Sequence, residues 1–154
     1  MHSTINLLHS FNRYFILIAI FFVLYRSLNG WLRRTPFTPL DNTASLVLLI
    51  LADVQLILGG IQYWFTSGFT QSAFANMGAA MKDSTLRYFA IEHIAAMLIA
   101  IVLIHVGRAS SKKALEDNLK HKKLAIFTGL ALLIIVISLA PKGLLMGSVA
   151  DWGN

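Results

Sequence analysis

The sequence of 154 residues contains no cysteine, only 3 prolines and a small share of charged residues. Without cysteine the chain forms no disulfide, holds no thiolate-ligated metal or iron–sulfur cluster, and attaches no haem through thioether bonds. Charged residues make up 13% of the chain, about half of what soluble domains carry, whereas apolar residues make up 56%. This balance excludes an ordinary soluble domain and indicates a membrane protein.

The apolar residues fall into four long blocks, and each block is long enough to cross a bilayer, which takes about 20 residues in a helix. The predicted spans cover residues 7–32, 44–65, 88–106 and 124–140. Pro36 and Pro39 separate the first two spans, and Pro141 ends the last one. Because four spans leave only termini and loops, we predict a single domain over residues 1–154, with an all-α fold that forms a transmembrane four-helix bundle.

The placement of the basic residues predicts how the bundle is oriented, because short cytoplasmic loops retain Lys and Arg during insertion. Nine basic residues flank one end of the spans: Arg26, Arg33, Arg34, Arg108, Lys112, Lys113, Lys120, Lys122 and Lys123. Four flank the other end: Arg13, Lys82, Arg87 and Lys142. We therefore expect a multi-pass membrane protein with both termini outside the cytoplasm, which is the periplasm in a Gram-negative cell. We attribute the excess of basic residues to this membrane orientation, and we expect no nucleic acid as a partner.

The connections between the spans carry no enzyme motif. The outer loop, residues 66–85, has enough Phe and Met for a short interfacial helix, and an irregular loop is the alternative. The inner connection carries lysines that suit a solvated face near anionic lipid. The chain has no P-loop, dinucleotide-binding glycine pattern, nucleophile elbow or zinc-protease motif. Hydrolase and kinase chemistry therefore has no support.

A few polar residues lie in or beside the spans, where an ionisable group needs a partner or a function. His9 and Arg13 stand four residues apart on one face of the first span, which predicts a buried polar end. On the third span, His93 lies near small residues: Ala90, Ala96 and Ala100, with Met97 beside them. This groove suits either a closely packed helix with a hydrogen-bonded histidine or a flat cofactor.

For three further polar residues, a structural role is the favoured interpretation. His105 lies about 18 Å along the helix from His93, so the two do not share a site, and we expect a hydrogen-bonded histidine near the cytoplasmic edge. His121 is expected to be solvated beside Lys122. Asp53 lies near mid-bilayer and needs a neighbour, for a hydrogen bond or for proton transfer.

Two histidines on facing helices can hold b-type haem through both axial positions, with arginines balancing the propionates. His9 and His93 are the outer-side pair within the spans, and Arg13 and Arg87 are the nearby cations. Counted from the inner edge, however, the two histidines differ in depth by about 5 to 12 Å. Ligation by both histidines therefore requires a tilted first helix or an inner edge near Arg26.

The chain resembles a group of short four-helix bacterial membrane proteins that are labelled cytochrome b-like. The resemblance extends over most of the chain and is carried by Leu8-His9-Ser10, Arg13-Tyr14, Gln55-Leu56, Leu58-Gly59, Met81-Lys82-Asp83, Leu86-Arg87-Tyr88-Phe89, Glu92-His93, Gly107-Arg108 and His121-Lys122-Lys123. It implies binding of haem b. Similar sequences often have histidine where this chain has Asp53, so any haem here depends on His9 and His93.

Two classes of function follow. In the first, the protein is a membrane electron carrier whose haem b, bound by His9 and His93, relays electrons to or from a quinone or a larger membrane complex. In the second, it is a non-redox accessory subunit whose polar residues stabilise the bundle or bind a partner. Both classes favour a carrier or subunit over an independent enzyme.

Overall fold

The computed structural model describes residues 2–61, 75–82 and 91–139, and helices account for nearly all of them. The helices are α1 (His2–Arg33), α2 (Pro39–Ile61), α4 (Met77–Lys82), α6 (His93–Lys113) and α7 (Asp117–Leu139). All except α4 are long and apolar enough to cross a membrane. The prediction of an all-α, multi-pass transmembrane four-helix bundle is therefore confirmed.

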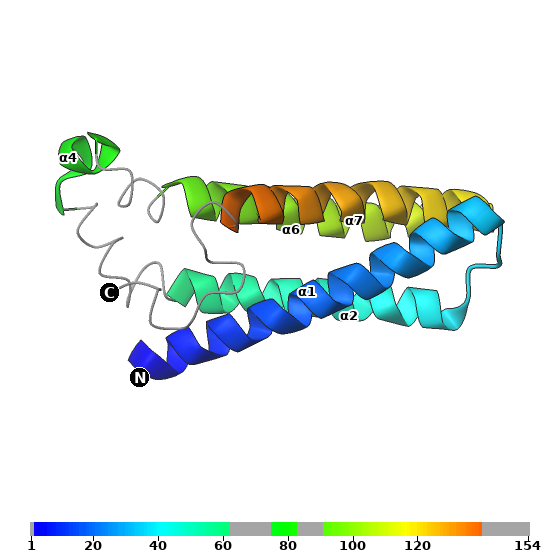
Figure 1. Ribbon diagram of the computed structural model, residues 1–154, viewed down its shortest axis with the longest axis horizontal. Helices are drawn as coiled ribbons and strands as arrows, with labels where there is room; N and C mark the ends of the chain where they lie inside the picture. Colours follow the sequence, from blue (N-terminus) through cyan, green and yellow to red (C-terminus); the bar gives the residue numbers. More distant parts are fainter. Residues whose placement is uncertain (1, 62–74, 83–90, 140–154) are drawn as a thin grey trace.

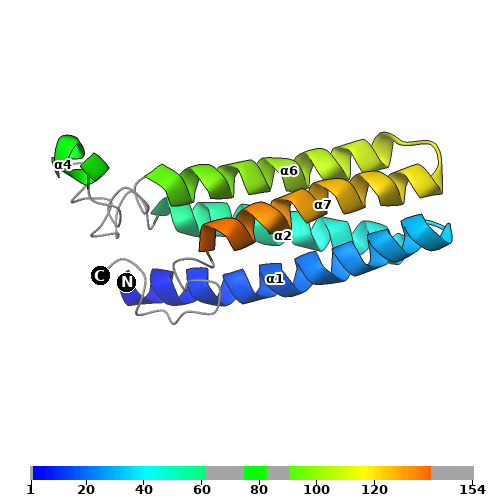
Figure 2. The same cartoon turned by 45° about the horizontal axis from the view of Figure 1, so that its top comes forward.

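The four long helices run alternately up and down, so that helices adjacent in sequence are adjacent in the bundle (Figure 1). α1 packs against α2 and α7, and α6 packs against the same two helices, which places α1 and α6 at diagonal corners. The turned view in Figure 2 shows α7 between α6 and α1. Side chains of α1 and α6 can therefore meet only through the middle of the bundle.

The connection from α1 to α2 is closed by local hydrogen bonds. Arg34 has a positive φ of 55°, and the Thr35 amide donates to the Gly30 carbonyl oxygen over 3.1 Å, which is the Schellman arrangement that ends a helix. α2 then begins with a capping box, in which the Thr38 amide donates to Asp41 Oδ2 over 2.8 Å and the Asp41 amide donates to Thr38 Oγ1. Asp41 also pairs with Arg26 of α1, so the same carboxylate caps α2 and binds α1.

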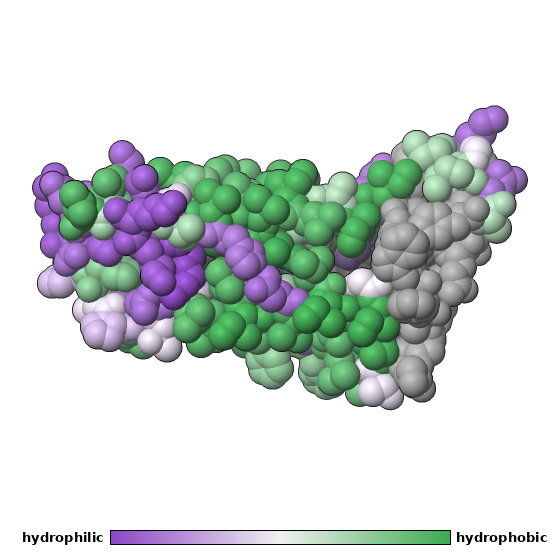
Figure 3. All heavy atoms as spheres, turned by 180° about the vertical axis from the view of Figure 1, so that it is seen from behind, coloured by the Kyte–Doolittle hydropathy of each residue, from purple (hydrophilic) through white to green (hydrophobic). Residues whose placement is uncertain are grey.

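The core is narrow and consists mainly of branched aliphatic and small side chains. Ile20, Val23, Leu48 and Ala131 are almost completely buried. Large apolar side chains cover the outer surface instead, as expected of helices in contact with lipid. Figure 3 shows that hydrophilic residues gather at the end that carries the α1–α2 and α6–α7 connections.

The helix ends differ from the predicted span ends because the helices continue beyond the apolar blocks. α2 begins at Pro39, α6 continues to Lys113, and α7 begins at Asp117. Polar residues can extend a helix into the interfacial region, where water and head groups satisfy their side chains. The outer loop contains the helix α4, in agreement with the helical alternative for that loop (Figure 1). Residues 62–65, 88–90 and 140 of the predicted spans lie outside the described residues.

The prediction that His121 is solvated is wrong. Only 1% of this residue is exposed, and its ring packs against Phe37 with the ring centroids 5.1 Å apart. The ring also lies against the backbone of Gly30, where an added β-carbon would come within 2.4 Å of it. The neighbouring lysines signalled solvent, but His121 faces the α1–α2 turn because α7 packs closely on α1.

Substitution of Gly30 by alanine is expected to destabilise the protein by about 1–3 kcal/mol, the usual cost of overpacking. The β-carbon would overlap the ring of His121, which is itself buried and packed against Phe37. Thermal unfolding of the detergent-solubilised protein measures the loss. His121→Ala removes the ring atoms, so Gly30→Ala is expected to cost less in that background. Equal costs in both backgrounds would contradict this packing.

Candidate functional site

The N-terminal half of α1 carries a group of buried polar side chains. Exposure is only 4% for His9, 7% for Asn12 and 4% for Arg13. Polar side chains at these positions face the bundle because His9, Asn12 and Arg13 are three to four residues apart and lie on one face of the helix. The predicted buried polar end of the first span is confirmed.

α2 supplies the hydrogen bonds that fix this face of α1. Asn12 Nδ2 donates to the Leu51 carbonyl oxygen and to Gln55 Oε1, each over 2.9 Å. Gln55 Nε2 donates to the His9 carbonyl oxygen over 3.1 Å and lies 3.4 Å from His9 Nε2. Polar groups withdrawn from water need such partners, and together these bonds lock α1 onto α2.

Gly59 makes room for the imidazole ring of His9. A β-carbon at Gly59 would lie 3.4 Å from His9 Cε1, closer than most such contacts. A larger side chain at this position would displace the ring. Gly59 therefore shapes the site on the α2 side, a role that the sequence analysis did not assign to it.

His93 reaches the same region from α6, at the diagonal corner of the bundle. His9 and His93 lie within electrostatic range of each other, and Arg13 lies within range of both. Arg13 also stacks against the ring of Tyr14, with the guanidinium carbon 5.0 Å from the ring centroid, and donates to the Tyr14 hydroxyl. Three of the four predicted site residues thus come together, while Arg87 lies outside the described residues.

α1 crosses the bundle obliquely instead of running parallel to α2 (Figure 1). A tilted first helix is one of the two arrangements that would bring His9 closer to the depth of His93. On α6 the small residues expected near His93 belong in part to the core, as the alternative of close helix packing requires. Ala100 is buried, Ala96 and Met97 are half-buried, and Ala90 lies outside the described residues.

The chemistry of these residues suits haem better than a bare metal ion. Within the described segments, no three His, Cys, Asp or Glu side chains gather to hold a metal by themselves. Haem iron takes four ligands from its porphyrin and needs only two axial imidazoles, with cations for the propionates. His9, His93 and Arg13 fit this requirement. Ligation through His9 Nε2 would additionally require that ring to turn away from Gln55.

A second polar feature lies on the other side of α2 and was not predicted as a pair. His105 Nε2 and Asp53 Oδ1 are 2.7 Å apart. This contact confirms that His105 is hydrogen-bonded and gives Asp53 the neighbour that it needed. Closer to the basic end, Arg108 donates to Ser45 Oγ over 2.5 Å and to the Asn42 carbonyl oxygen over 2.9 Å, which fastens α6 to the start of α2.

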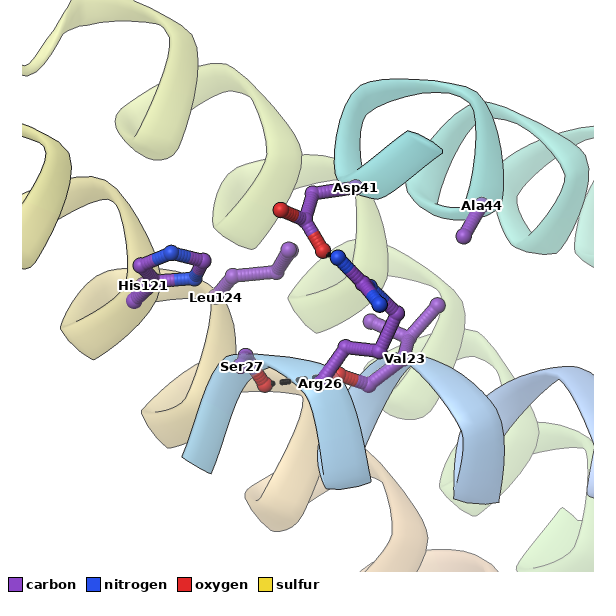
Figure 4. A pocket seen from close by; sticks show the side chains of 7 residues that line it. All are labelled: Val23, Arg26, Ser27, Asp41, Ala44, His121 and Leu124. Carbon is purple, nitrogen blue, oxygen red and sulfur yellow. Dashed lines mark hydrogen bonds and ion pairs between the residues drawn. The ribbon is translucent and has the colours of Figure 1, made fainter. Parts of the chain in front are cut away.

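The small pocket drawn in Figure 4 lies near the basic end of the bundle and has a structural role. Arg26 and Asp41 pair with each other, so the pocket has no excess charge to attract an ion. The side chain of Leu124 lies between His121 and this pair in the view. Ser27 donates back to the Val23 carbonyl oxygen of its own helix over 2.8 Å.

Comparison of the chain with family models, with curated proteins and with solved structures finds no match.

Proposed function

We propose that this protein is an electron carrier of the bacterial inner membrane that holds one haem b in the outer half of the bundle. His93 and His9 would ligate the haem iron, and Arg13 and Arg87 would balance the charge of the propionates. The observation that supports this most is the meeting of His9, His93 and buried Arg13 at the outer end, on helices at diagonal corners. The resemblance to cytochrome b-like proteins points the same way.

When bound, haem supplies one-electron transfer between ferric and ferrous iron. The protein residues have simpler tasks. The imidazoles would ligate the iron, Arg13 would offset the propionate charge, and the apolar surface of the bundle would keep the site in a water-poor environment. The redox partner would be a quinone or a larger membrane complex. The protein acts as a carrier and not as an independent enzyme.

A non-redox accessory subunit is the second candidate, and one observation favours it. Gln55 already binds the carbonyl of His9 and approaches the ring nitrogen that haem ligands normally use. The Asn12–Gln55–His9 network is also what a purely structural polar lock between two membrane helices would need.

The absorption spectrum of the protein purified in detergent from haem-replete cells decides between the two. The carrier is expected to be coloured, with a Soret band and with α and β bands that sharpen on reduction by dithionite. Pyridine haemochrome analysis is expected to give about one haem b per chain. A colourless preparation that is folded by circular dichroism would favour the accessory subunit.

The proposed orientation places the basic end in the cytoplasm and both termini outside. Leu115 in the α6–α7 connection is 96% exposed, and Met81 in α4 is 46% exposed, so both positions accept a cysteine probe in a chain without other cysteines. In intact spheroplasts, Met81→Cys is expected to react with a membrane-impermeant maleimide and Leu115→Cys to react only after lysis. The opposite pattern would reverse the orientation.

A further inference from the structure

Asp53 of α2 and His105 of α6 form a hydrogen-bonded pair on the outside of the bundle, within the membrane-spanning region. Their side chains are each 43% exposed, although Asp53 lies about 21 Å along the helix axis from Pro39 and about 12 Å from Ile61. Ionisable groups at such depth are rare and almost always face the bundle interior. This pair instead faces the surroundings, and that exposure calls for an explanation.

The pair joins α2 to α6 at the edge of the core and is not buried in it. The core positions next to it are filled by apolar side chains, namely Ala52 on α2 and Ala100 and Ile104 on α6, all of which are buried. By contrast, Asp41 in the other described ion pair is buried and helps to close a helix turn. The Asp53–His105 pair is therefore placed where a ligand, and not the core, would contact it.

The chemistry of the pair is that of an oriented base. An ionised Asp53 accepts the proton of His105 Nε2, which leaves Nδ1 with a lone pair. No hydrogen bond from the described part of the chain reaches Nδ1. A carboxylate that fixes the imidazole tautomer in this way prepares the far nitrogen to accept a hydrogen bond. The preferred ligand is thus a hydrogen-bond donor.

The surroundings of the pair restrict the ligand further. The exposed neighbours on the same faces are bulky and apolar, namely Ile50 and Ile57 on α2 and Leu98 and Val102 on α6. A partner helix would favour small residues that allow close approach, and these residues are not small. A flat ring dissolved in the lipid does not need close approach of two helix backbones, so these bulky side chains do not exclude it. Figure 3 shows a hydrophilic band that continues from the basic end onto the middle of the hydrophobic face.

We infer that the Asp53–His105 pair is a binding site for the head group of a membrane quinol, with a quinol hydroxyl donating to His105 Nδ1. This inference rests on the proposed function, since it identifies where the lipid-soluble redox partner binds. The site is open to the bilayer, so the head group reaches it without crossing water. The fixed tautomer predicts that the reduced quinol, a donor, binds better than the oxidised quinone, which only accepts.

The test measures binding of tritiated decyl-benzoquinol to the full chain in nanodiscs, under anaerobic conditions, against empty nanodiscs. We expect saturable binding to the wild type and weaker binding of the quinone. His105→Ala is expected to lower the affinity about tenfold or more, the effect of one well-placed hydrogen bond in an apolar environment. Asparagine can donate to or accept from Nε2, so Asp53→Asn is expected to reduce the preference for quinol over quinone.

The control variant is His93→Ala, which is expected to bind quinol like the wild type even if it retains no haem. Quinol binding is thereby separated from haem binding, so a colourless protein that binds quinol would reject only the proposed haem. Wild-type binding no greater than that of empty nanodiscs would overturn the inference, and so would equal affinity in His105→Ala. A dimer that dissociates on His105→Ala substitution, without quinol binding, would assign the pair to contact with a second copy.

Discussion

Replacement of His93 by alanine is expected to abolish haem retention by the purified protein. On α6 the next histidine, His105, lies about 18 Å further along the helix and is bound to Asp53, so no other imidazole on that helix takes over. Haem b is held only by its ligands and by packing in a chain without cysteine. The measurement is the Soret absorbance per chain after size-exclusion chromatography.

Added imidazole and further variants distinguish loss of the haem ligand from misfolding of the protein. Imidazole added to His93→Ala is expected to restore a six-coordinate spectrum, because the free ligand can enter the space left by the side chain. His9→Ala is expected to weaken retention or to give a five-coordinate spectrum. His105→Ala is the matched control and keeps its haem. Haem that persisted in the His9, His93 double variant would reject this site, and haem lost only in His105→Ala would place it near the other end of the bundle.

The helices were predictable because a bilayer imposes one strong requirement, a run of about 20 apolar residues for each crossing. The ends were less predictable, since Lys113 and Asp117 are polar yet continue their helices. The order of the helices around the bundle follows from packing. Loop length hints at it, but the diagonal placement of α1 and α6 had to be seen in the structure.

For the candidate site, sequence reasoning found the ionisable residues but not their partners. Periodicity placed His9 and Arg13 on one face, and both are buried. Asn12 was not singled out, and Gly59 was named without a role, because an amide and a glycine are common in membrane helices and acquire meaning only through the contacts with Gln55 and His9. A useful signal was available, since Gln55 and Gly59 are four residues apart and therefore share a helix face.

One wrong prediction and one unforeseen contact share a cause. His121 was assigned to solvent from its lysine neighbours, and the pairing of Asp53 with His105 was not foreseen. Both contacts depend on which helices pack against each other. The partners are far apart in sequence, so no local pattern predicts the contact. His105 and Asp53 are 52 residues apart, and His121 and Phe37 are 84 apart. Pairwise helix packing, and not composition, decides such contacts.

Substitution of Gly107 by alanine is expected to destabilise the bundle more than Gly30→Ala does. Gly107 of α6 faces Phe127 of α7, and an added β-carbon would lie 2.6 Å from Phe127 Cβ. α6 and α7 pack closely along their length and are joined by a short connection, so neither helix can move aside alone. Relief requires the two backbones to separate, which places the cost at about 3 kcal/mol or more, at the upper end for overpacking.

The second-site variants distinguish this contact from the one at Gly30. The atom that Gly107→Ala would strike is the β-carbon of Phe127, which alanine also has, so Phe127→Ala is not expected to rescue it. His121→Ala, by contrast, removes the ring that the new β-carbon of Gly30→Ala would overlap.

Gly60→Ala and Gly129→Ala are the controls. An added β-carbon meets nothing within 4 Å at Gly60, and at Gly129 it meets only Leu24 Cδ1, at 3.8 Å. Both controls are expected to be neutral or to stabilise their helices by up to about 1 kcal/mol in thermal unfolding, since alanine has the higher helix propensity. Loss of stability in Gly60→Ala as large as that in Gly107→Ala would show that added bulk alone, and not the α6–α7 contact, sets the cost.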